Sequence, residues 1–180
     1  MRQIVTLLGF CVTVLVCLLV PCNVKADTPL PPPKIKEVWS HNKEYCAVMD
    51  PQQMITTVYR VEPGDKRTKS WSMYGWFRVA DLSNDGNHLI TGHPGINLLP
   101  LNFTMDDVMI YFFRRGELIH TVQLKELVSN QSALKRTASH FLWGSYLGLD
   151  SHDRYLVETV ENRKLVFDIK TGKPLAETAK

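Results

Sequence analysis

Short apolar runs separated by turn-forming residues fill most of the chain from residue 44 onward. Within the runs, apolar and polar positions tend to alternate, and β-branched and aromatic residues are frequent, which is typical of half-buried β-strands. Gly, Asn, Asp or Pro stands at the ends of the runs and indicates turns. The runs that we predict as strands are 44–50, 54–61, 71–80, 88–92, 107–113, 117–122, 140–149, 154–160 and 164–169.

The connections between these strands are too short for the crossovers that parallel strands need, so we expect antiparallel pairing. One segment departs from the strand pattern. Residues 124–136, "LKELVSNQSALKR", place Leu124, Leu127 and Val128 on one side of a helix. The predicted fold class is therefore mainly β, built from antiparallel hairpins with one short helix.

A degenerate repeat runs through this pattern. Ser40, Ser83 and Ser151 are each followed by a turn-forming pair, an aromatic residue or histidine, and then an apolar strand. The three copies begin 43 and 68 residues apart, and in each a partner strand ends in a Gly turn. Those partner strands cover 58–66, 110–118 and 166–174.

The repeat resembles single blades of β-propellers of the WD40 or quinoprotein-like kind, in which "S-x-D-G-x-x-L" opens one strand and "V-x-x-F-D-x-x-T-G" closes another. The resemblance is best at 83–91 and 165–172, and these sequence motifs are also similar to those of short exported bacterial proteins. A closed propeller usually has at least about four blades of roughly forty residues. We therefore expect a twisted sheet or a two-layer arrangement of hairpins. A partial propeller completed by a second chain is the alternative.

The N-terminus predicts export. An uncharged apolar run from Ile4 to Val20 follows Arg2, and Val24 and Ala26 occupy the −3 and −1 positions of a signal-peptide cleavage site. Cleavage between Ala26 and Asp27 places the protein in the periplasm or outside the cell. Two alternatives keep it at a membrane: the run could stay uncleaved as an anchor, or Cys22 could be lipidated.

Removal of residues 1–26 leaves 180 − 26 = 154 residues, enough for one domain. We expect a Pro-rich extended arm at 27–36, a β-rich domain at 37–176 and a short tail at 177–180. The mature chain carries 19 basic and 18 acidic residues, because Arg2 and Lys25 leave with the signal. This near-neutral charge does not indicate nucleic-acid binding, nor a basic patch for membranes once the signal is removed.

Candidate chemistry is sparse. The segment "DLSNDG" (81–86) resembles half a calcium loop, but Gly92 stands where a bidentate Glu is needed, so we predict a hairpin turn. The histidines lack the three or four converging ligands of a zinc site, and we predict no metal and no cofactor. Cys46, the one cysteine left after cleavage, lies in an apolar strand and is expected to be buried and inert. Ser139 and His140 are strand neighbours, which should point to opposite faces and be unable to pair.

Aromatic and cationic side chains favour a binding surface. Two segments, "RTASHFLWGSYLGL" and "WSMYGWF", are rich in the residue types that anchor interfaces. The same side chains could instead fill the core. The candidate binding residues are Arg136, His140, Trp143, Tyr146, Tyr74 and Trp76.

The leading hypothesis is an exported, non-enzymatic β-domain that binds a protein or glycan partner. One alternative is a hydrolase or metal-dependent enzyme that uses His88, His93 or His140. Another is a structural protein that associates with itself through open sheet edges. Convergence of Arg136, His140 and a carboxylate such as Asp150 in a closed pocket would favour the enzyme, whereas their lying flat on a sheet face would count against it.

Overall fold

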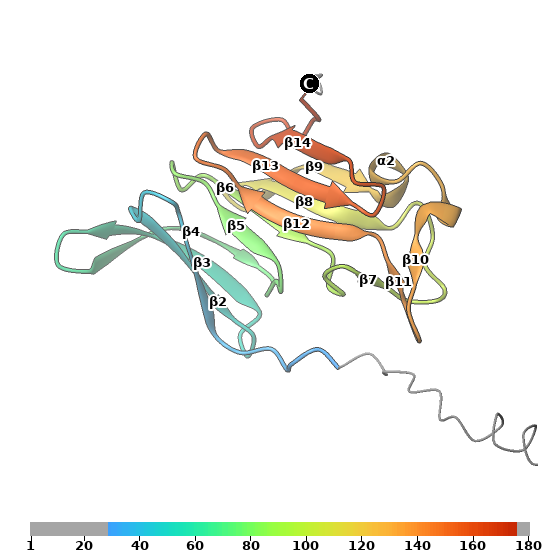
Figure 1. Ribbon diagram of the computed structural model, residues 1–180. Coiled ribbons are helices and arrows are strands. Elements are labelled where there is room, and N and C mark those ends of the chain that lie inside the picture. The colour runs from blue at the N-terminus through green and yellow to red at the C-terminus, as the bar shows by residue number, and fades with distance from the viewer. Residues whose placement is uncertain (1–28, 176–180) are drawn as a thin grey trace, which may run out of the picture.

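The computed structural model describes residues 29–175. The predicted signal peptide, its cleavage position and Cys22 lie outside these residues. The described part is mainly β, its strand pairs are antiparallel, and it has one short α-helix, so the predicted fold class is confirmed (Figure 1). None of its helices is long and apolar enough to cross a membrane.

Three sheets follow one another along the chain, and each is a meander of antiparallel strands. The N-terminal sheet contains β1 (Lys36–Trp39), β2 (Tyr45–Asp50), β3 (Ile55–Glu62) and β4 (Lys66–Tyr74). The central sheet contains β5 (Ala80–Leu82), β6 (His88–Gly92), β8 (Val108–Arg114) and β9 (Glu117–Gln123). The C-terminal sheet contains β12 (Gly144–Leu149), β13 (Arg154–Thr159) and β14 (Lys164–Asp168).

A fourth, smaller sheet joins loops that are distant in sequence. It pairs β10 (Lys135–Arg136) with β11 (Phe141–Leu142), and β11 with β7 (Leu98–Leu99). Helix α2 (Leu124–Leu127) and the 3₁₀ turn η1 (Gln131–Ala133) precede it. The helix is shorter than the periodicity predicts, because the backbone is already extended at its C-cap, Val128.

The central sheet is covered on both faces. One core lies between the N-terminal and central sheets, and a larger core lies between the central and C-terminal sheets. Strand β8 shows how, because neighbouring strand residues point to opposite faces. The Phe113 ring lies 6.1 Å from Phe77 in the first core, and the Phe112 ring lies 6.1 Å from Tyr155 in the second. The sheets thus stack as three layers.

The repeated turns are confirmed in two copies and corrected in the third. The Ser40 hydroxyl accepts the Tyr45 amide (3.0 Å), and the Ser83 hydroxyl accepts the His88 amide (2.9 Å). In the third turn the acceptor is the Asp150 carboxylate, which takes the Arg154 amide at 2.9 Å. The alignment on Ser151 was therefore wrong by one residue. In the third turn the Asp150 carboxylate, in place of a serine hydroxyl, accepts the amide at the start of the next strand, and this amide is four residues away instead of five.

The three turns also bind one another. The Asn42 amide donates to the Asn84 side-chain oxygen (2.9 Å), and the Asn84 amide donates to the Asp153 carboxylate (3.1 Å). His41 Nε2 donates to the Leu149 carbonyl at the end of β12 (2.9 Å). These bonds tie the sheets together at the ends that carry the repeat.

Cys46 is fully buried in β2. Burial, aided by the nearby Glu37 carboxylate, raises the pKa of its thiol to about 11. The thiol is therefore protonated at neutral pH and is a poor nucleophile.

Candidate functional site

The loop that follows β6 organises the candidate site. Its residues 93–100, "HPGINLLP", are called the 93–100 loop below. The Trp143 indole N–H donates to the Ile96 carbonyl (3.0 Å), and the Tyr146 hydroxyl accepts the His93 amide (2.8 Å). The Tyr146 hydroxyl in turn donates to the Met109 carbonyl (2.7 Å). The side chains of Trp143 and Tyr146 thus fix the 93–100 loop by hydrogen bonds to its backbone.

Trp143 is accordingly a core residue. Its side chain is fully buried, and its ring packs edge-on against Tyr146 at 5.0 Å. Burial raises the pKa of the Tyr146 phenol above its ordinary value, so the phenol stays neutral and hydrogen-bonded. The prediction that Trp143 presents a face to a partner was therefore wrong: the aromatic residues of this segment support the site from inside.

The described residues of the Pro-rich arm, from Pro29 onward, lie against the domain. The Trp76 indole N–H donates to the Lys34 carbonyl (2.9 Å), and the Arg78 guanidinium donates to the Pro31 carbonyl (2.7 Å). Arg78 also lies over the Trp76 ring at 5.4 Å. Trp76, a predicted binding residue, therefore binds the protein's own arm.

A cavity of about 450 Å³ lies between the arm, the 93–100 loop and the loop that joins β10 to β11. We call it the histidine cavity. Its walls are largely apolar, with a few polar tips, which is the usual chemistry of a binding pocket. It is lined by Pro29, Leu30, His93, Gly95, Leu98, Pro100, Ser139 and His140.

His93 is a neutral ring in this cavity. Burial lowers the pKa of the imidazole, and the nearby Asp107 carboxylate opposes this only in part. The ring's Nδ1 accepts the Gly95 amide at 3.1 Å, so the proton is on Nε2. His93 therefore offers a hydrogen-bond donor without a charge.

Ser139 and His140 form a pair, which the strand interpretation had excluded. The Ser139 hydroxyl lies 2.9 Å from His140 Nδ1. The chain turns here, since the Thr137 amide donates to the His140 carbonyl (2.9 Å) and the His140 amide donates to the Thr137 hydroxyl (3.0 Å). Neighbouring side chains can meet in a turn, although they diverge in a strand.

The other predicted residues lie outside the cavity lining. His88 is buried in the second repeated turn, with Nδ1 3.5 Å from Asp85. Arg136 is exposed in the small sheet, and Tyr74 is 75% exposed at the end of β4. Within residues 29–175, no group of three or more His, Cys, Asp or Glu side chains is placed to hold a metal ion.

Sequence reasoning missed the apolar walls. Leu30 and Leu98 were not singled out, because isolated leucines are common everywhere. Their signal was the neighbouring prolines, since both leucines lie in Pro-bounded segments, "PLPPP" and "HPGINLLP", in which proline leaves little room for a long strand.

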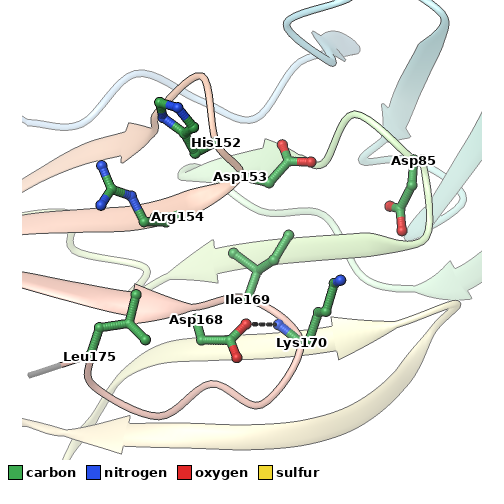
Figure 2. A pocket seen from close by; sticks show the side chains of 8 residues that line it. All are labelled: Asp85, His152, Asp153, Arg154, Asp168, Ile169, Lys170 and Leu175. Carbon is green, nitrogen blue, oxygen red and sulfur yellow. Dashed lines mark hydrogen bonds between the residues drawn. The ribbon is translucent and has the colours of Figure 1, made fainter.

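A second hollow of about 410 Å³ lies at the turn end of the central and C-terminal sheets. Figure 2 shows charged side chains of both signs around it, among them Asp85 and Asp153. These carboxylates are already engaged by the protein. The Ser83 hydroxyl and the Asn87 amide overcome the effect of burial and lower the pKa of Asp85 to about 2, and Asp153 accepts the Asn84 amide. This charged hollow is explained by turn structure.

The chain matches no protein-family model, and a search of curated proteins finds no match. Its function therefore has to be argued from its own residues.

Proposed function

We propose that the protein is an exported binding module that holds a protein or glycan partner in the histidine cavity. The observation that carries this proposal is the cavity itself. The arm and the 93–100 loop supply apolar walls, and two histidines and a serine supply polar tips. Such a combination provides apolar burial together with a few directional hydrogen bonds.

The supports beneath the cavity favour the same function. Binding sites gain affinity when their loops are fixed before the ligand arrives. Trp143 and Tyr146 fix the 93–100 loop, and Trp76 and Arg78 fix the arm. A histidine cavity whose bordering loop and arm are ordered before binding is suited to recognising a partner.

The scaffold is consistent with blade-like repeats, as the resemblance to propellers implies. Three meanders stack in chain order, and in each the turn between the first two strands is closed by a serine or aspartate side chain. We interpret the stack as a support that carries the site on its loops.

Site-specific photo-crosslinking tests the proposal. Leu30, which lines the cavity, is replaced by benzoylphenylalanine, and the matched control carries the same group at Leu118, which is 55% exposed on β9. We expect one adduct from native envelope or culture medium at position 30, weakened by His140→Ala, and none at position 118. Equal labelling at both positions would overturn the proposal.

A hydrolase is the second candidate, and the Ser139–His140 pair favours it. A hydroxyl 2.9 Å from an imidazole nitrogen is the geometry of a serine activated by a general base. The purified protein is incubated with p-nitrophenyl esters and with Ser139→Ala as control. Ester hydrolysis above background that disappears in Ser139→Ala would favour the hydrolase over the binding module.

A further inference from the structure

A third hollow lies where the first strands of the three sheets meet. Strand β5 contacts both β1 and β12, and a cavity of about 360 Å³ opens beside them. We call it the polar hollow. It is lined by Lys36, Arg78, Val79, Ala80, Asp81, Ile96, Asn97, Ser145, Tyr146, Leu147 and Gly148. None of these residues lines the histidine cavity, and the 93–100 loop contributes to both.

The hollow contains two cations with unused hydrogen-bonding capacity. Lys36 Nζ donates to the Arg78 carbonyl (2.8 Å), and within the described residues it has no salt bridge to a carboxylate. Burial lowers the pKa of its ammonium group, and Asp81 opposes this shift. Among residues 29–175, the Arg78 guanidinium donates one N–H to the Pro31 carbonyl, which leaves its other N–H groups available to a ligand.

The hollow also contains fixed acceptors. The Asp81 carboxylate accepts the Leu149 amide, and burial raises its pKa despite Lys36 and His41 nearby. Gly148 gives it room, because a Cβ there would lie 3.0 Å from an Asp81 oxygen. Asn97 and Ser145 add an amide and a hydroxyl, which both donate and accept.

This mixture defines the chemistry of a ligand. Two cations and one carboxylate leave an excess of one positive charge, which a single carboxylate on the ligand would balance. A simple anion leaves Asp81 unsatisfied, and an ammonium group would face Lys36 and Arg78. Hydroxyl groups satisfy Asp81, Asn97 and Ser145 together, and they do so without adding another charge to a half-buried site.

We infer that the polar hollow binds an acidic sugar, with the sugar carboxylate at Lys36 and Arg78 and the sugar hydroxyls at Asp81, Asn97 and Ser145. The apolar face of the ring packs on the wall formed by Tyr146 and Leu147, which is 47% exposed. This site goes beyond the proposed function and does not depend on the histidine cavity.

Calorimetric titration with trigalacturonate tests the inference, with maltotriose as the neutral control. We expect the purified protein to bind trigalacturonate and not maltotriose. Lys36→Met, which keeps the side-chain length without the charge, should weaken binding at least about tenfold, since it removes a charged hydrogen bond to the sugar carboxylate. Lys69→Met on the exposed part of β4 is the matched control and should bind as wild type does.

Three results would overturn the inference: no binding of trigalacturonate, equal binding of maltotriose, or unchanged binding by Lys36→Met. Ser145→Asp provides a second test if Lys36→Met does not fold, because a new negative charge in the hollow should abolish binding. His140→Ala separates the two sites. This variant should leave trigalacturonate binding unchanged. Loss of binding would mean that the sugar occupies the histidine cavity, and it would refute the assignment to the polar hollow.

Discussion

Replacing Trp143 should destabilise the whole fold and loosen the 93–100 loop. Its side chain is fully buried and gives its indole N–H to the Ile96 carbonyl. Trp143→Ala therefore removes a large core side chain and should cost about 3–5 kcal/mol of unfolding free energy. Trp143→Phe keeps an aromatic ring but leaves the Ile96 carbonyl without its partner, which should cost about 1–3 kcal/mol.

Urea unfolding followed by circular dichroism measures both costs, and Tyr74→Ala is the exposed control, expected within about 0.5 kcal/mol of wild type. Amide hydrogen exchange adds the local readout. Exchange in residues 93–100 should accelerate in both Trp143 variants, and exchange in β2 should be unaffected in Trp143→Phe. If Trp143→Ala costs no more than Tyr74→Ala, Trp143 does not anchor this loop and the description of the site is wrong.

Three further predictions concern the joints between sheets. Burial raises the pKa of Asp81 in the folded state, so the stability that this carboxyl group contributes is fully present below its ordinary pKa of 3.8 and is lost as the pH rises through the raised pKa. In thermal melts at a series of pH values, Asp81→Asn should therefore remove this decrease of melting temperature with rising pH. Gly148→Ala should lower the unfolding free energy, measured by chemical denaturation, more than Gly64→Ala does. The backbone φ is similar at the two positions (85° and 83°), but only an alanine at 148 places a Cβ against Asp81. Equal losses of unfolding free energy would mean that contact with Asp81 is not the cause. Ser83→Ala should lower the unfolding free energy by about 1–2 kcal/mol, whereas Ser151→Ala should change it by less than about 0.5 kcal/mol, and the reverse order would restore the original alignment of the third turn.

The fold class could be predicted because it depends on local periodicity. Alternating segments such as "RYLVETV" became strands with one buried side, and the turn side chains at Ser40 and Ser83 act within five residues of themselves. The stacking of three layers could not be predicted in the same way. Phe112 and Phe113 are adjacent aromatics in the sequence, and only the tertiary structure shows that they serve different cores.

The candidate site was predicted only in part, for a similar reason. His93 and His140 were recognised as candidate chemistry, but their meeting depends on the pairing of β7 with β11, whose partners lie 42 and 44 residues apart (141 − 99 and 142 − 98). The exposed and buried uses of an aromatic side chain have the same sequence signature, so Trp143 was assigned to the wrong one. Lys36 and Asp81 were not predicted, because a polar hollow between three sheets leaves no periodic trace in any one strand.

The peptide unit at Leu149 has a consequence for how this protein can vary. Its carbonyl is held by His41 of the first repeated turn, and its amide is held by Asp81 of the central sheet. The joint is thus made by main-chain atoms that every amino acid except proline supplies. The joint therefore depends on the side chains of His41 and Asp81, and a substitution at residue 149 that fits the same core position leaves it in place.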